Sequence, residues 1–190
     1  MSNQLVALMV IDMQRGMSDP AIGERNNPDA ENNIQSLLTE WRKAGWPVVH
    51  VRHISRTPSS PFWPGLPGAE FQPALAPQPK EHVVEKNIPC AFTHSGLERW
   101  LHAREIKRLV IVGVSTSNSV EATARTAGNL GFDTHVVADA TFTFAKQDYA
   151  GTYRTADEVH AMSLANLEGE YAAIFSTGEA LKLLASGHHQ

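Results

Sequence analysis

Short apolar runs recur along the chain, and each has the length of a β-strand rather than of a helix. They occupy residues 5–11, 48–51, 82–85, 108–114, 134–138 and 172–175. A continuous apolar run is typical of a strand that is covered on both faces, as in a parallel sheet. Between the runs, apolar residues follow a helical spacing over residues 29–43, 96–104, 117–130, 156–167 and 179–184. Strands that alternate with helices predict an α/β fold, with a parallel sheet and helices on both faces.

Three segments lie outside this pattern. Residues 55–80 carry seven prolines together with Phe62, Trp63 and Phe71. A long irregular segment in a compact domain is usually functional or disordered, and the aromatic residues favour an ordered lid or a subunit contact. The pattern predicts a polar loop over residues 141–155 and an unstructured tail over residues 186–190. Because we find neither a repeat nor a linker, we expect a single domain over residues 1–190.

Composition and charge exclude several classes of protein. The chain is 42% hydrophobic and 19% charged, which is typical of a globular protein, and its formal net charge is −4. It contains no basic block, so we expect no nucleic-acid partner. No apolar run approaches the roughly 18 residues that a membrane-spanning helix needs. The first residues lack the basic region of a signal peptide, which favours a cytoplasmic location.

Charged residues follow several of the predicted strands where they end. Asp12 follows the first strand, Arg52 and His53 follow the second, and Lys86 follows the third. In open α/β sheets, ligands bind outside the carboxyl ends of the strands. Taken alone, Asp12 is equally compatible with a helix cap and His53 with an ordinary loop. Partial burial of Lys86 would require an anionic partner, which Asp12 could supply.

The fourth strand leads into VGVSTSNSVEATAR at residues 112–125, which is rich in small hydroxyl residues. A strand, a turn and a helix N-terminus bring unpaired backbone N–H groups together. The nucleophile-elbow pattern G-x-S-x-G is absent, as are the P-loop and dinucleotide-binding patterns. Taken alone, the serines of this stretch are best explained as helix N-caps. The single cysteine, Cys90, excludes an intramolecular disulfide and is interpreted as a packed small hydrophobe.

Four motifs occur in this order: VIDMQ at 10–14, VVEKNIPCAF at 83–92, GVSTSNSVEATAR at 113–125 and VADATFTF at 137–144. On these motifs the chain resembles the isochorismatase-like (cysteine hydrolase) family over nearly its whole length. The resemblance implies a doubly wound α/β fold with a six-stranded parallel sheet. It also implies a site made of an aspartate, a lysine and a cysteine. By motif position the aspartate is Asp12 and the lysine is Lys86, and a cis peptide bond joins Val114 to Ser115.

The chain departs from the family motif at the nucleophile. The family pattern is G-x-x-T-x-x-C-V, and residues 113–120 carry Ser119 where the pattern has cysteine. Cys90 lies in a different motif and does not replace it. A serine hydroxyl is a weaker nucleophile than a thiol and depends on an adjacent base.

Three functions follow from this departure. In the first, the protein hydrolyses a small amide or ester, with Ser119 as the nucleophile, Asp12 as its base and Lys86 holding Asp12 ionised. In the second, it hydrolyses a vinyl ether without a covalent intermediate, as isochorismatases do, with Asp12 protonating the substrate. In the third, it is a catalytically impaired or deliberately altered relative that binds a small molecule or a partner. We favour the first.

The other expectations follow from the preferred function and the family resemblance. The backbone N–H groups of Ser115 and Ser119 form the oxyanion hole, and His53, Phe62 and Trp63 contact a small neutral substrate. The nicotinamidase branch binds a metal through an Asp-x-His pattern, and the corresponding Val51-Arg52-His53 lacks the aspartate, so we expect neither a metal nor another cofactor. We expect a homo-oligomer, a dimer or a tetramer, because oligomers are common in the family and because residues 58–73 carry exposed aromatic residues and prolines.

Overall fold

A central parallel sheet organises the molecule. The computed structural model describes residues 5–187. The strands lie in the order β3-β2-β1-β4-β5-β8, and every neighbouring pair is parallel. They are β1 (Val6–Ile11), β2 (Val48–His53), β3 (His82–Lys86), β4 (Arg108–Val114), β5 (Asp133–Phe142) and β8 (Ala173–Phe175). The predicted six-stranded α/β sheet is therefore confirmed.

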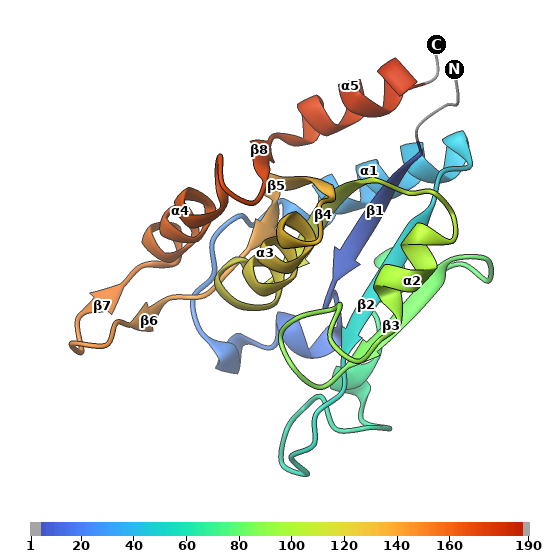
Figure 1. The fold of residues 1–190 in the computed structure, drawn as a ribbon. Helices are drawn as coiled ribbons and strands as arrows, with labels where there is room; N and C mark the ends of the chain where they lie inside the picture. The colour runs from blue at the N-terminus through green and yellow to red at the C-terminus, as the bar shows by residue number, and fades with distance from the viewer. Residues whose placement is uncertain (1–4, 188–190) are drawn as a thin grey trace.

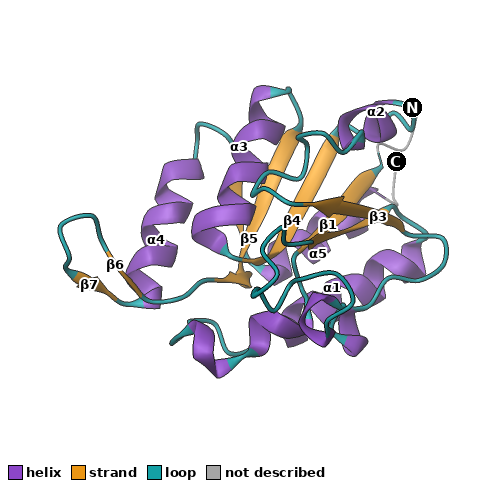
Figure 2. Ribbon diagram, turned by 90° about the horizontal axis from the view of Figure 1, so that it is seen from below, coloured by secondary structure: helices purple, strands orange, loops and turns teal. Residues whose placement is uncertain are grey.

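Helices cover both faces of this sheet (Figure 2). They are α1 (Ala30–Ala44), α2 (Leu97–His102), α3 (Glu121–Asn129), α4 (Ala156–Leu167) and α5 (Thr177–Gly187). Alternate residues of β1 point to opposite faces, as the two-residue period of a strand requires. Leu8 packs in the cluster that includes Trp41 of α1 and Leu184 of α5. Met9 packs in the cluster that includes Leu101 of α2 and Ala124 of α3. This double burial explains why the strands are continuously apolar.

The close approach of β1 and β4 requires a glycine. Gly113 has a φ of +116°, and a Cβ at this position would lie 2.1 Å from the carbonyl oxygen of Ile11. A side chain would therefore clash with the backbone of β1, and the φ angle alone disfavours one. Gly113 lets β4 run beside β1 to the point where both strands deliver their site residues.

Several local predictions were wrong. The helix expected over residues 117–130 begins as a wide helical turn, η5 (Thr116–Val120), and only then continues as α3. The loop expected over 141–155 contains the end of β5 and a hairpin of β6 (Lys146–Gln147) and β7 (Tyr153–Arg154). This hairpin projects from the body of the molecule beside α4 (Figure 1). The tail was expected to begin at residue 186, but α5 extends to Gly187, and residues 188–190 lie outside the described part.

The irregular segment over residues 55–80 is largely as predicted. It contains two short 3₁₀ turns, η3 (Pro67–Ala69) and η4 (Pro73–Leu75), and two more, η1 (Arg15–Ser18) and η2 (Pro20–Ile22), follow β1. Its aromatic residues are less exposed than the sequence indicated, because Phe62, Trp63 and Phe71 are each half-buried. None of the helices within residues 5–187 is long and apolar enough to cross a membrane.

Candidate active site

Three strand ends bring together the residues of the predicted site. Asp12 follows β1 directly, Lys86 is the last residue of β3, and Ser119 lies on η5, the turn that follows β4. In the sheet, β2 separates β3 from β1, and Lys86 is level with His53 in the register of the two strands. The Lys86 side chain therefore extends past the end of β2 to reach Asp12.

The Lys86 ammonium bridges the other two side chains. Its Nζ donates a hydrogen bond of 2.7 Å to Oδ2 of Asp12 and one of 3.2 Å to Oγ of Ser119. The side chains of Lys86 and Asp12 are 0% and 1% exposed, and Ser119 is 6% exposed. An ion pair that is removed from water in this way needs good geometry and further hydrogen bonds, and the Ser119 hydroxyl supplies one of them.

Burial makes Asp12 a stronger base than an ordinary aspartate. Removal from water raises the pKa of Asp12, while the charge of Lys86 and hydrogen bonds with Lys86 and Ser119 lower it; burial is the largest effect. The second carboxylate oxygen, Oδ1, is also buried and has no hydrogen-bond partner within residues 5–187. A carboxylate with a raised pKa and an unoccupied oxygen is suited to accept a proton within the site.

The turn that carries Ser119 has the backbone geometry that the family resemblance implied. The Val114–Ser115 peptide bond is cis, which confirms that expectation. The N-cap interpretation of the serines was wrong, because neither η5 nor α3 has a side-chain cap. Instead, the hydroxyls of Ser115 and Ser117 lie 2.7 Å and 2.9 Å from Oγ1 of Thr143. The later VADATFTF segment thus supports the turn from the side of β5.

The three residues expected to contact substrate have different surroundings. His53 is half-buried, and its pKa is lowered first by burial and then by Lys86, with Asp12 acting in the opposite direction. The Phe62 ring packs edge-on against His53, with 6.1 Å between ring centroids. Trp63 lines a hollow of about 520 Å³ together with Lys86 and others. The Lys86 side chain is fully buried, so this hollow does not expose its ammonium.

Gln14 is a site residue that sequence reasoning missed. Its Nε2 donates to the carbonyl oxygens of His53 at 2.8 Å and Ala69 at 3.0 Å, and the backbone N–H of His53 donates to its Oε1 at 2.7 Å. One buried side chain therefore ties the end of β1 to the end of β2 and to the 55–80 segment. The sequence signal that could have identified Gln14 was its place in the VIDMQ motif, two residues after Asp12.

Cys90 and the histidines of the described residues form no second centre. The Cys90 thiol donates to Oγ1 of Thr126 at 3.3 Å and packs against the core that includes α3, as expected of a small hydrophobe. Within residues 5–187, no three His, Cys, Asp or Glu side chains are grouped so that they could hold a metal ion. The absence of a metal cofactor stays a prediction.

Comparison with known proteins gives a consistent picture. Residues 6–178 match the family model described as the isochorismatase domain. The crystal structure of an isochorismatase-family protein from Chromobacterium violaceum superposes with a TM-score of 0.93 at 48% identity, covering 97% of this chain and 95% of that one. The isochorismatase family protein YrdC of Bacillus subtilis is 37% identical over 96% of this chain and 97% of its own length. Nicotinamidase 3 of Arabidopsis thaliana is 28% identical, over 90% of this chain and 84% of its own.

Proposed function

Because this chain belongs to the isochorismatase family and is a hydrolase, we propose that it hydrolyses a small amide or ester through a covalent intermediate on Ser119. The observation that carries the proposal is the buried bridge from the Lys86 ammonium to both Asp12 and Ser119. It supplies the three requirements of nucleophilic catalysis: a nucleophile, an adjacent base and a group that orients the base. The name of the plant relative, a nicotinamidase, is in keeping with an amide substrate.

In the first half of the reaction, Oγ of Ser119 attacks the carbonyl carbon of the substrate. Its proton passes to the carboxylate of Asp12, and the carbonyl π electrons move to the oxygen. The hydrogen bond from Lys86 leaves the Ser119 proton free to point towards Asp12, because Oγ is the acceptor in that bond. When the tetrahedral intermediate collapses, the protonated Asp12 returns the proton to the leaving amine or alcohol, and an acyl group remains on Ser119.

In the second half, water attacks the acyl group and Asp12 accepts a proton from that water. The carboxylic acid leaves, and Ser119 regains its proton from Asp12. The charge of Lys86 limits how far burial raises the pKa of Asp12, so that the carboxylate is available as a base. No cofactor enters either half of the reaction.

The oxyanion formed in each half needs hydrogen-bond donors that are already in place. We assign this role to the backbone N–H groups of Ser115 and Ser119. The support is positional: Ser115 begins the turn that presents Ser119. Removing one donor from such a site commonly costs about 10²–10³-fold in rate. His53 and Phe62 are assigned to the substrate wall because their rings pack together beside the ion pair, and Trp63 to its outer part.

One observation also favours a second candidate, hydrolysis of a vinyl ether without a covalent intermediate. The free Oδ1 of Asp12 and the raised pKa of this carboxyl suit an acid that protonates a substrate carbon directly. In that reaction Ser119 would bind substrate or water and form no bond to carbon. A chain that turns over no substrate of either kind would correspond to the third function, binding without catalysis.

Trapping of the acyl group distinguishes these functions. The protein is mixed with p-nitrophenyl acetate, quenched in acid and examined by mass spectrometry after trypsin digestion. The proposal expects an acetyl group on the peptide of residues 109–125, lost in Ser119→Ala and retained in Ser117→Ala. The Ser117 hydroxyl hydrogen-bonds to Thr143 and takes no part in the proposed reaction. Release of p-nitrophenol that is equally fast in wild type and Ser119→Ala, with no acetylated peptide, would overturn the role of Ser119. A parallel assay of vinyl ether cleavage by Asp12→Ala and Ser119→Ala tests the second candidate.

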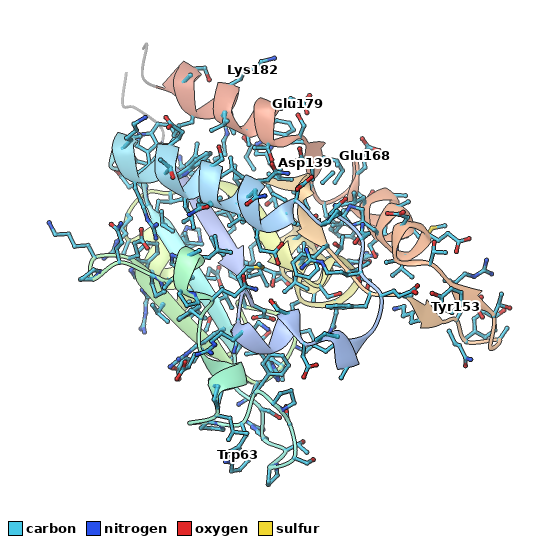
Figure 3. The ribbon with its side chains drawn as sticks, turned by 180° about the vertical axis from the view of Figure 1, so that it is seen from behind. Trp63, Asp139, Tyr153, Glu168, Glu179 and Lys182 are labelled. Carbon is cyan, nitrogen blue, oxygen red and sulfur yellow. The ribbon has the colours of Figure 1, made fainter. Side chains whose placement is uncertain are left out.

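We also propose that the protein is a homo-oligomer and that its interface is formed by the hairpin and α4. The sequence pointed to residues 58–73, but the most exposed large apolar side chains lie elsewhere: Tyr149 at 105%, Met162 at 65% and Tyr153 at 55%. Tyr149 and Met162 line a hollow of about 880 Å³ that carries both Lys146 and Glu158, a mixture of charges that a second copy can complement. Figure 3 shows Tyr153 on the hairpin, far from Trp63 on the 55–80 segment.

Light scattering at micromolar concentration tests this assignment. We expect a particle heavier than the 20.8 kDa of one chain, and we expect Met162→Glu to reduce it to that mass. The matched control is Leu66→Glu, which puts the same charge on an exposed apolar residue of the 55–80 segment. A wild-type particle of 20.8 kDa would refute oligomerisation. Dissociation by Leu66→Glu and not by Met162→Glu would show that the interface lies at residues 58–73 instead. A cytoplasmic location stays a prediction alongside these.

A further inference from the structure

A buried histidine on α4 contacts the turn that presents Ser119. Nδ1 of His160 lies 2.8 Å from Oγ1 of Thr116, the first residue of η5, and Thr116 is fully buried. Nothing in the proposed reaction uses His160, and no family motif noted in the sequence contains it. The contact joins residues 44 positions apart, so it fixes α4 against the start of the turn.

The neighbours of His160 determine where its proton lies. Asn27 Nδ2 is 3.5 Å from His160 Nε2, but it also donates to the carbonyl oxygens of Ala138 at 2.8 Å and Thr141 at 2.7 Å. An amide nitrogen has two hydrogens, and these short bonds use both. The Asn27 contact with Nε2 is therefore not a hydrogen bond, and Nε2 is free to carry a hydrogen.

The carbonyl oxygen of Ala138 lies on the Nε2 side of the ring, because it is 2.8 Å from Asn27 Nδ2, which is itself 3.5 Å from Nε2. A hydrogen bond with the Ala138 backbone raises the pKa of His160, which is the effect of an acceptor that faces a ring hydrogen. With the hydrogen on Nε2, the neutral ring presents a lone pair at Nδ1. The Thr116 hydroxyl must then donate to Nδ1, and its own lone pairs face away from His160. Burial is the largest effect on His160 and lowers its pKa, which keeps the ring neutral.

We infer that His160 is a positioning residue, which in its neutral form with the hydrogen on Nε2 fixes the Thr116 hydroxyl and through it the start of the turn that carries Ser119. The inference rests on the proposed function in one respect, namely that the residue at position 119 is the nucleophile. A misplaced turn moves both the attacking atom and the N–H groups of Ser115 and Ser119. Positioning errors of this kind reduce rate with little effect on binding.

The effect of His160 on the turn can be measured without knowing the substrate. In a Ser119→Cys background, iodoacetamide alkylates the thiol at position 119, and trypsin releases that position in the peptide of residues 109–125. Cys90 falls in a separate peptide, residues 87–99, and provides an internal reference for general unfolding. The measured quantity is the alkylation rate at position 119 relative to that at Cys90.

Four single substitutions and one double variant in this background test the inference. His160→Leu removes the acceptor, and Thr116→Val removes the donor with little change of shape. Each should lower the relative rate roughly tenfold, and the double variant should be no slower than either single one, because hydrogen-bonded partners are not additive. His160→Asn keeps an acceptor near the position of Nδ1 and should restore most of the rate. His135→Leu is the matched control: His135 is another buried histidine, but it packs against Phe175, and we expect no change.

The hydrogen position is tested directly by long-range ¹H–¹⁵N NMR of the wild-type protein. We expect His160 to be neutral at pH 7 with its hydrogen on Nε2, and we expect its Nδ1 resonance to shift in Thr116→Val. A hydrogen on Nδ1, or a charged ring at pH 7, would overturn the inference. So would unchanged alkylation in His160→Leu, or additive losses in the double variant. These outcomes leave the proposed function intact, because trapping of the acyl group on Ser119 is a separate experiment.

Discussion

The Nζ atom of Lys86 lies 2.7 Å from Oδ2 of Asp12, although 74 residues separate them and β2 lies between their strands. Both side chains are almost completely buried. The pair therefore depends on the parallel sheet, which brings the carboxyl ends of β1 and β3 to one edge. The predictions below concern this pair, the Ser119 nucleophile, the contact between β1 and β4, and the buried histidines.

Removal of Lys86 should destabilise the protein strongly. Lys86→Met keeps the length of the side chain but leaves the Asp12 carboxylate without its cation. Breaking a buried ion pair on one side commonly costs about 3–5 kcal/mol. We expect a loss of this size in urea unfolding at pH 7.5, and a smaller loss for Asp12→Asn combined with Lys86→Met. A loss in the double variant equal to the sum of the losses in Lys86→Met and Asp12→Asn would show that the pair is not coupled.

Substitution of Ser119 should separate nucleophile strength from scaffold geometry. Ser119→Ala should lower kcat for a p-nitrophenyl ester by roughly 10⁴-fold or more, because loss of a nucleophile removes the covalent route. Ser119→Cys should react faster than wild type in forming the acyl group, since a thiolate is the stronger nucleophile. The measurement is single-turnover kinetics, with Ser117→Ala as the control. Full activity of Ser119→Ala together with loss in Asp12→Ala would favour the non-covalent reaction.

Gly113→Ala should destabilise the protein through the contact of β4 with β1. The added Cβ would meet the Ile11 carbonyl, and the φ of +116° is unfavourable for alanine. An incompatible substitution of this kind costs more than about 1 kcal/mol. Gly131→Ala is the control, because Gly131 also has a positive φ but no atom within 4 Å of the added Cβ. Thermal unfolding should show the larger loss for Gly113→Ala.

Buried histidines should make the protein less stable in mild acid. Burial lowers the pKa of five histidines below the ordinary 6.5: His50, His53, His82, His135 and His160. The unfolded chain therefore binds more protons than the native protein once the pH falls below 6.5. Their contribution to the free energy of unfolding is complete above pH 6.5 and is lost as the pH falls through the lowered values.

Urea unfolding at pH 7.5 and pH 5.5 measures this loss. Asp12 has the opposite effect on the pH dependence of stability, because its pKa is raised in the native protein. The comparison is therefore made in Asp12→Asn as well as in wild type. In both proteins, the urea concentration at the unfolding midpoint should be lower at pH 5.5 than at pH 7.5. An unchanged midpoint in Asp12→Asn would contradict the prediction.

The fold was predictable because its signals are local. Runs such as residues 5–11 are apolar at every position, since both faces of β1 are covered, and this is visible without any knowledge of the partners. The motif positions of Asp12, Lys86 and Ser119 were also readable from the chain. The hairpin of β6 and β7 was not predicted, because strands of two residues carry too little pattern, and the turn of η5 was hidden inside a helical spacing.

The sequence alone determined the strands, the helices and the residue types at the strand ends. Only the tertiary structure decided which of those residues meet, which are buried and which polar atoms lie within hydrogen-bond distance of one another. Gln14 and His160 became visible as supports of the site only when their partners, 39 and 44 residues away, were seen beside them. The physical reason is that burial and hydrogen bonding are properties of neighbours in space. A single chain position specifies a donor or an acceptor, and the packed sheet selects its partner.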